Sequence, residues 1–182
     1  MAINMIIIMG LPGSGKSTIL NALRSKRNDY TISNYGDLML DIEKAKGWVQ
    51  NRDEMRKLPI EKQKLAQKLV AKKLAKEKGK FILDTHCSIS TPSGYYPGLP
   101  FEFLNGLKVD KLIYVTADVE EIKLRRTNDP SRIRDSDDVA EHDEINRYYL
   151  AAYSAFTGAP AVIIYNKQGK LEETVKKIAD LL

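Results

Sequence analysis

The sequence predicts an α/β fold of three layers, in which helices cover both faces of a five-stranded parallel sheet. Its length of 182 residues, with 43% hydrophobic and 29% charged residues, is typical of one globular domain. Short β-rich runs alternate with longer segments of helical periodicity, which is the pattern of repeated strand–helix–strand units. The runs are almost continuously apolar, as expected for parallel strands that are buried on both faces.

Five short apolar runs are expected to form the strands of this sheet. In chain order they are Ile3–Met9, Tyr30–Asn34, Phe81–Asp84, Lys111–Thr116 and Ala161–Tyr165. Helical spacing is found in the segments between and after them. These segments are Lys16–Arg27, Gly36–Lys46, Glu61–Lys78, Val119–Thr127, Val139–Thr157 and Leu171–Leu182. We therefore expect residues 1–182 to form a single domain.

Three segments are too long, or too rich in turn-forming residues, for simple connections between strands. Residues 36–79 form an oversized crossover that is interrupted near Gly47–Asn51, and Pro59 within it suits a helix start. Residues 85–100 contain three prolines and two glycines, which predicts an ordered loop. Residues 128–138 are short, charged and helix-breaking. We expect these three segments to be functional insertions in one domain.

The cysteine count and the hydrophobic runs exclude several classes of protein. A single cysteine, Cys87, cannot form an internal disulfide or a four-thiolate zinc site. The apolar run Met5–Met9 is much shorter than the roughly 20 residues of a membrane-spanning helix, and no signal-peptide features surround it. We expect a cytoplasmic protein that does not associate with membranes.

The net charge of +5 is located mainly in residues 61–80, which contain eight lysines and two glutamates. Apolar residues recur there at helical spacing, with lysines on the remaining faces. These apolar residues are Leu65, Ala66, Leu69, Val70 and Leu74. The pattern favours an amphipathic helix with a solvated face and no stable nucleic-acid partner. An RNA-binding surface is the alternative, and the absence of aromatic residues among the lysines disfavours it.

A glycine-rich motif follows the first strand and opens the first helix. Gly10-Leu-Pro-Gly-Ser-Gly-Lys-Ser-Thr18 matches G-x-x-x-x-G-K-[ST], the P-loop. Its glycines let successive N–H groups surround a phosphate, and the following helix adds its positive end. Lys16 is expected to reach the outer phosphates, and the Ser17 hydroxyl to bind Mg²⁺. The expected ATP-binding residues are Gly10, Leu11, Pro12, Gly13, Ser14, Gly15, Lys16, Ser17 and Thr18.

A P-loop needs an acidic residue on a neighbouring strand to hold the water shell of the metal ion. Asp84 ends a predicted strand, where the carboxyl ends of parallel strands meet the ligand crevice. We therefore expect Ser17 and Asp84 to form the Mg²⁺ site, and a loop-capping role is the structural alternative for Asp84. The segment Asp84-Thr-His-Cys87 lacks the Asp-x-x-Gly of a GTPase switch, which disfavours a GTPase.

Four arginines lie within ten residues of each other: Arg125, Arg126, Arg132 and Arg134. Planar guanidinium groups match the charge that spreads over the oxygens of a transferring phosphoryl group. We expect Arg126, Arg132 and Arg134 to act in catalysis together with Lys16. Arg125 is the best candidate for a structural role, because adjacent helix residues point about 100° apart. Arg147, on the following helix, could also reach the phosphates.

Beyond the P-loop, the chain resembles the archaeal-type adenylate kinases along nearly its whole length. The matching stretches are Asn34-Tyr-Gly-Asp37, Asn51-Arg-Asp-Glu-Met-Arg-Lys-Leu58, Asp84-Thr-His86, Thr91-Pro-Ser-Gly-Tyr-Tyr-Pro-Gly-Leu-Pro100, Arg125–Asp135, Glu141-His142 and Asn146-Arg147. The resemblance implies the reversible reaction of ATP with AMP to give two ADP, with Mg²⁺, in a cytoplasmic enzyme that is often a homotrimer.

The resemblance also assigns residues to the acceptor side of the site. It implies that residues 36–79 are a helical insertion that binds the nucleoside monophosphate, and that residues 128–138 are a short lid. The implied AMP-binding residues are Gly36, Asp37, Arg52, Arg56 and His86. Two positions depart from the pattern, since Leu40 stands where larger adenylate kinases carry arginine, and Ser90 stands where relatives tend to carry a basic residue. The departures place more weight on the two arginines of the insertion as ligands of the AMP phosphate.

Other functions of a P-loop protein remain open at the level of sequence. The main alternative is a P-loop ATPase that acts in RNA or ribosome assembly, with the lysines of residues 61–80 as its contact surface. A small-molecule kinase of the shikimate or gluconate type is possible on the fold alone. An acceptor requirement separates these functions, because an assembly ATPase needs no second substrate.

Arg132 and Arg134 are expected to act in the transition state, because their polar segment must close over the phosphates before they can contact the transferring group. Replacing either with lysine should lower kcat by at least about 10², with a smaller change in KM. Steady-state kinetics of Arg132→Lys and Arg134→Lys measure both constants. A rise in KM alone would make these arginines substrate anchors.

Overall fold

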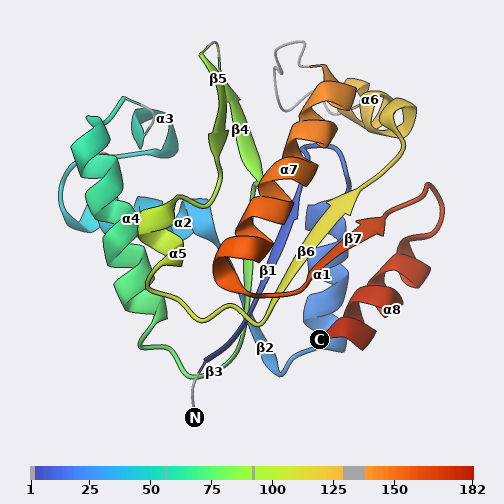
Figure 1. The fold of residues 1–182 in the computed structure, drawn as a ribbon, viewed down its shortest axis with the longest axis horizontal. Helices are drawn as coiled ribbons and strands as arrows, with labels where there is room; N and C mark the ends of the chain where they lie inside the picture. Colours follow the sequence, from blue (N-terminus) through green and yellow to red (C-terminus); the bar gives the residue numbers. More distant parts are fainter. Residues whose placement is uncertain (1–2, 56, 92, 129–137) are drawn as a thin grey trace.

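Five parallel strands form the central sheet, in the order β2-β3-β1-β6-β7 (Figure 1). The computed structural model describes residues 3–55, 57–91, 93–128 and 138–182. The strands are β1 (Ile3–Gly10), β2 (Tyr30–Asn34), β3 (Gly79–Thr85), β6 (Lys111–Thr116) and β7 (Ala161–Tyr165). All five predicted strands are present, with small differences at the ends of β1 and β3. The predicted α/β fold with a five-stranded parallel sheet is therefore confirmed.

Helices cover both faces of this sheet (Figure 1). α1 and α8 pack on one face, and α2, α4, α5 and α7 pack on the other. The helices are α1 (Lys16–Lys26), α2 (Tyr35–Ala45), α3 (Arg52–Met55), α4 (Ile60–Leu74), α5 (Phe101–Leu104), α6 (Val119–Thr127), α7 (Val139–Thr157) and α8 (Leu171–Leu181). Within the described ranges, no helix has the length and apolarity that a membrane span requires.

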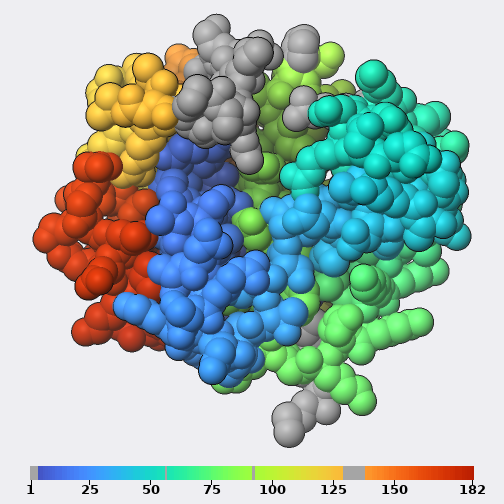
Figure 2. Space-filling view, turned by 180° about the vertical axis from the view of Figure 1, so that it is seen from behind, coloured from blue at the N-terminus to red at the C-terminus, as the bar shows by residue number. Residues whose placement is uncertain are grey.

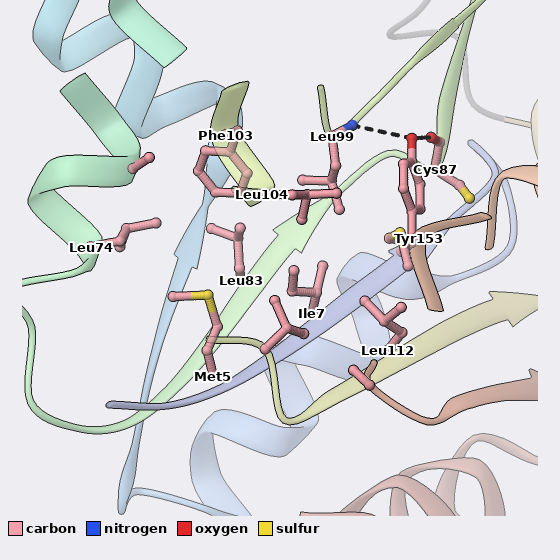
Figure 3. Close-up of a cluster of buried hydrophobic side chains, with 14 of the residues drawn as sticks. Met5, Ile7, Leu74, Leu83, Cys87, Leu99, Phe103, Leu104, Leu112 and Tyr153 are labelled. Carbon is pink, nitrogen blue, oxygen red and sulfur yellow. Dashed lines mark hydrogen bonds between the residues drawn. The ribbon is translucent and has the colours of Figure 1, made fainter. Parts of the chain in front are cut away.

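Alternate residues of β1 belong to two separate hydrophobic cores. Met5, Ile7 and Met9 point into the core beneath α4, α5 and α7, part of which is shown in Figure 3. Ile6 and Ile8 point into the core beneath α1 and α8. All five side chains are buried, because successive residues of a strand face opposite sides and both sides are covered. The continuous apolar run in the sequence has this origin.

The register of the sheet brings three functional segments to one edge. β1 lies between β3 and β6, with Ile8 paired with Asp84 and Gly10 paired with Val115. The pairing of β2 with β3 places Asn34 beside Asp84. The carboxyl ends of β1, β2 and β3 therefore meet, and the loop that leaves β1 begins within reach of Asp84.

The long crossover between β2 and β3 contains α2, α3 and α4. The predicted helix over Glu61–Lys78 is present, but it begins at Ile60 after the N-cap Pro59 and ends at Leu74. Ala66, Val70 and Leu74 are buried as predicted, and the amphipathic helix is confirmed for them. The expectation that Leu65 joins this face is wrong, since 45% of it is exposed. It lies about 100° around the helix from Ala66.

Residues 85–100 are more regular than the ordered loop that the sequence predicts. They contain an antiparallel hairpin of β4 (Ser88–Thr91) and β5 (Gly94–Pro97). Four-residue strands are too short for an alternating pattern to appear in the sequence. The base of the hairpin is fixed to α7, because the Tyr153 hydroxyl donates to the Cys87 carbonyl oxygen at 2.7 Å and accepts from the Leu99 N–H at 3.3 Å (Figure 3).

Gly98 is expected to be necessary for this hairpin base. A Cβ atom at Gly98 would lie 2.0 Å from the His86 carbonyl oxygen, so Gly98→Ala must displace backbone. We expect a loss of about 1–3 kcal/mol in the free energy of unfolding, measured by chemical denaturation. Gly106→Ala is the matched control, since its nearest neighbour would be the Ala71 Cβ at 3.8 Å. Equal stability of the two variants would contradict the expected clash.

Candidate active site

The P-loop between β1 and α1 has a backbone that only glycine tolerates at several positions. Gly13 and Gly15 have φ values of 92° and 85°, in the left-handed region. Gly10 has no room for a side chain, because a Cβ there would lie 2.6 Å from the Val115 carbonyl oxygen. α1 begins directly after the loop, at Lys16. The loop is therefore curled tightly at the positive end of a helix, as anion binding requires.

The outer side of the P-loop is held by hydrogen-bond donors from distant elements. The Asn166 side chain donates to the Ser14 carbonyl oxygen at 2.8 Å. Arg125 donates to the same oxygen at 3.3 Å, and Arg126 donates to the Pro12 carbonyl oxygen at 2.8 Å. Because the N–H and C=O of a peptide group point in opposite directions, bonding of these carbonyls outward favours N–H groups directed inward.

Lys16 and Asp84 form an ion pair across the edge of the sheet. The second carboxylate oxygen of Asp84 accepts a hydrogen bond of 2.8 Å from the Asn34 side chain. Both charged side chains are mostly buried, with 10% and 14% of their surface exposed. The structure therefore brings together the lysine and the acid that the sequence assigns to phosphate and metal.

A cavity of about 370 Å³ lies beside this ion pair. In Figure 2 the surface is hollowed between the blue segment of β1 and α1 and the cyan segment of α2 and α3. Six predicted site residues line the cavity: Lys16, Ser17, Gly36, Arg52, Asp84 and His86. Its other walls come from α2, α3, α4 and the hairpin base. One space thus connects the P-loop with the helical insertion.

At the start of α2, the residues predicted to bind the acceptor contact one another. Arg52 forms an ion pair with Asp37, and more than half of each side chain is exposed. A Cβ atom at Gly36 would lie 3.4 Å from Arg52 Nη2, so this glycine leaves room for the guanidinium group. Exposed ion pairs contribute little to stability. Arg52 can therefore leave the Asp37 carboxylate and pair with a phosphate group at little cost in stability.

Three predicted arginines cannot be located relative to this cavity. Arg56, Arg132 and Arg134 lie outside the described residues, as does most of the segment 128–138 predicted to be a lid. Arg126 is beside the P-loop. Arg125, for which the sequence favours a structural role, donates to a carbonyl oxygen on the outer side of the P-loop.

The sequence analysis did not identify a buried polar network between α7 and the strands. Asp143 accepts hydrogen bonds from the Tyr114 and Thr116 hydroxyl groups at 2.9 and 2.6 Å. It also forms an ion pair of 2.8 Å with Arg147. Arg147, which the sequence allowed near the phosphates, pairs with Asp143 of the same helix and donates to the Tyr165 hydroxyl. The hydroxyl groups of β6 and the charge of Asp143 are thus hydrogen-bonded to each other, which fixes α7 against β6.

A second branch of this network reaches the hairpin that closes the cavity. Ser88 donates to Asn146 Oδ1 at 2.6 Å, and its oxygen lies 3.1 Å from His142 Nε2. Asn146 in turn donates to the Tyr114 hydroxyl oxygen at 3.1 Å. In the sequence, His142 and Asn146 appear only in two stretches that resemble the archaeal-type adenylate kinases, with no indication of their partners. Their partners are far away in the chain, so the pattern alone does not reveal them.

A P-loop after the central strand of a parallel sheet, in one cavity with a helical insertion, defines a P-loop kinase. Residues 9–143 match the family described as AAA domain. The chain is 43% identical over 182 residues to the adenylate kinase of Methanopyrus kandleri, covering 96% of this chain and 95% of that protein. It is 44% identical over 179 residues to the adenylate kinase of Thermoplasma acidophilum, covering 97% of each. The chain belongs to the adenylate kinase family.

Solved structures agree with this fold. A shikimate kinase from Acinetobacter baumannii superimposes with a TM-score of 0.57, over 98% of this chain and 92% of that chain. The identity of 14% means that this likeness shows the fold alone. The resemblance to adenylate kinases drawn from the sequence motifs is confirmed by the curated relatives.

Asn166 is expected to support ATP binding without touching the nucleotide through its side chain. Asn166→Ala removes the donor to Ser14 and should weaken the Kd for ATP with Mg²⁺ by about 10-fold, the effect of one lost buried hydrogen bond. Isothermal titration calorimetry measures this constant. Asn105 is exposed at the end of α5, so Asn105→Ala is the control and should bind ATP with the Kd of the wild type. An unchanged Kd in Asn166→Ala would contradict the role.

Proposed function

We propose that this protein catalyses the reversible transfer of a phosphoryl group from ATP to AMP, giving two ADP. The observation that carries the proposal is the single cavity lined both by Lys16 and Ser17 of the P-loop and by Gly36 and Arg52 of the helical insertion. A donor and an acceptor nucleotide bound at its two sides would present their phosphates to each other. Membership of the adenylate kinase family supports AMP as the acceptor.

On the donor side, the P-loop residues 10–18 bind the phosphates of ATP through their backbone N–H groups. Lys16 moves from Asp84 to the outer phosphates and holds negative charge there. Arg126 acts beside the P-loop, and Arg132 and Arg134 complete the positive charge around the transferring group. The segment 128–138 covers the site and excludes water, which suppresses hydrolysis of ATP.

The residues at the junction of donor and acceptor fit a magnesium ion. Mg²⁺ prefers oxygen ligands, and the Ser17 hydroxyl and the Asp84 carboxylate line the same cavity. Ser17 would bind the ion directly and Asp84 would hold its water shell. When bound, Mg²⁺ supplies positive charge to the phosphate oxygens. Asn34 orients Asp84 for this role through its 2.8 Å hydrogen bond.

On the acceptor side, Arg52 and Arg56 hold the phosphate of AMP. Gly36 and Asp37 form the start of α2, and Asp37 releases Arg52 when the phosphate arrives. His86 lies in the wall of the cavity and orients the acceptor. A neutral acceptor such as a sugar would not need two arginines, so this pairing supports an anionic substrate.

We further propose a cytoplasmic enzyme without a stable nucleic-acid partner. The buried residues Ala66, Val70 and Leu74 leave the lysines of α4 on a solvated face, which supports a solubilising role for them. A homotrimer is proposed from the family resemblance. Exposed aromatic residues support an interface, since the tilted rings of Phe101 and Phe156 lie 5.0 Å apart with 60% and 45% of these residues exposed. Light scattering of the purified protein measures its oligomeric state.

An acceptor panel tests the proposed function. The protein is mixed with ATP, Mg²⁺ and one of AMP, GMP, CMP, UMP, shikimate, gluconate or water, and ADP is measured. We expect AMP to be preferred by at least about 10²-fold, a difference that unmatched hydrogen bonds in a polar site can produce. Equal ADP formation with and without AMP would overturn the kinase function and favour an ATPase. Equal rates with GMP or CMP would overturn the choice of AMP alone.

A further inference from the structure

One face of α2 forms a wall of the cavity along most of the helix. Tyr35, Met39 and Glu43 follow one another at intervals of four residues, so their side chains lie on the same face, and all three line the cavity. Glu43 is eight residues beyond Tyr35, which corresponds to ~12 Å along the helix axis. The cavity therefore extends from the phosphate-binding start of α2 towards its far end.

One carboxyl oxygen of Glu43 is buried without a hydrogen-bond partner among the described residues. Glu43 is 1% exposed, and its Oε2 atom has no partner among the described residues. The Tyr35 hydroxyl, one of the polar groups on the same wall, is also buried and has none. Buried polar groups in folded proteins are nearly always hydrogen-bonded, and the exceptions call for an explanation. Two residues that line one cavity thus carry polar atoms without a partner, and a polar ligand could supply one.

The surroundings of Glu43 favour its neutral form. Burial raises the pKa of the Glu43 carboxyl group, because removal from water disfavours the charged form. The pKa of Tyr35 is raised by burial and by the negative charge that Glu43 carries when ionised, so the Tyr35 hydroxyl keeps its proton. A neutral carboxyl group offers one O–H donor and one C=O acceptor side by side.

We propose that Glu43 reads the adenine base of AMP through this donor and acceptor. The amino group of adenine donates to the carbonyl oxygen of Glu43, and an adjacent ring nitrogen accepts from its O–H. This inference rests on the proposed function, since it takes AMP as the acceptor. Glu43 is a specificity-determining residue in this assignment, and it forms no covalent bond.

The remaining walls near Glu43 suit a purine base. Met39 and Met55 line the same cavity, and their flexible thioether side chains pack well against an aromatic ring. Gln63 and Gln67 of α4 lie across the cavity and add further hydrogen-bonding groups. Arg52 lies at the other end, beside Gly36 at the start of α2. The phosphate and the base of one nucleotide can thus be held at opposite ends of α2.

The test compares two substrates in the wild-type protein and in two single variants of Glu43. The substrates are AMP and purine riboside 5′-monophosphate, which lacks the amino group. The variants are Glu43→Ala and Glu43→Gln, and glutamine keeps one donor and one acceptor in nearly the same shape. Asp41→Ala is the control, because Asp41 is an exposed carboxylate on the same helix. KM and kcat are measured with saturating ATP, together with the KM for ATP and the melting temperature without nucleotide.

We expect the wild type and Asp41→Ala to prefer AMP over the analogue by at least about 10-fold in kcat/KM. Glu43→Ala should raise the KM for AMP by about 10-fold or more and treat the two substrates alike, with the KM for ATP unchanged. Glu43→Gln should keep the preference and a KM for AMP within about threefold of the wild type. The melting temperature of neither variant should fall by more than a few degrees, because the Oε2 atom of Glu43 has no hydrogen-bond partner among the described residues.

Three results would overturn the inference. Persistence of the AMP preference in Glu43→Ala would show that another group reads the base. Failure of Glu43→Gln to keep the preference, with an unchanged melting temperature, would show that a neutral acid is not the reading group. An equal effect of Asp41→Ala would show a general electrostatic cause. Failure of the proposed function looks different, since the wild type would then form no ADP in response to AMP.

Discussion

The polarity of the peptide group constrains the P-loop, and much of the surrounding structure satisfies that constraint. A loop that turns its N–H groups towards a phosphate must turn carbonyl oxygens outward, where they need donors. Asn166, Arg125 and Arg126 are those donors, and they come from segments that follow β7 and β6. Arg125 is itself held by Glu121, at 2.8 Å. The nucleotide loop therefore depends on the complete sheet, and it cannot keep its shape as a local motif.

Features that arise from local sequence were predictable, and features that arise from distant pairs were not. The strands follow from apolar runs, and the position of Asp84 at a strand end follows from the polarity of parallel strands. The support of the P-loop by Asn166 was missed, because the two segments are 152 residues apart. Glu43 was missed for another reason. In an amphipathic helix with charged neighbours, a glutamate is expected on the solvated face, and only the fold places it inward.

The unsatisfied polar groups of this protein are concentrated where nucleotides are proposed to bind. The buried side-chain oxygens without a partner among the described residues are those of Ser14, Tyr35 and Glu43. Ser14 belongs to the P-loop, and the other two line the cavity. Each such group costs about 1–3 kcal/mol in the empty protein. The hydrophobic cores and the network around Asp143 compensate for this loss elsewhere in the domain.

In the ion pair of Lys16 with Asp84, the two charges of the pocket neutralise each other. Lys16 is already paired with Asp84, so neither inorganic phosphate nor a free metal ion meets an uncompensated charge at this pair. A lone anion would have to remove the lysine and leave the aspartate buried without a counter-charge, which is costly. In the proposed function, a nucleotide that arrives with its metal would replace both halves at once, with a phosphate for the lysine and a cation for the aspartate. Under that proposal, the buried pair favours a ligand that carries both charges over either ion alone.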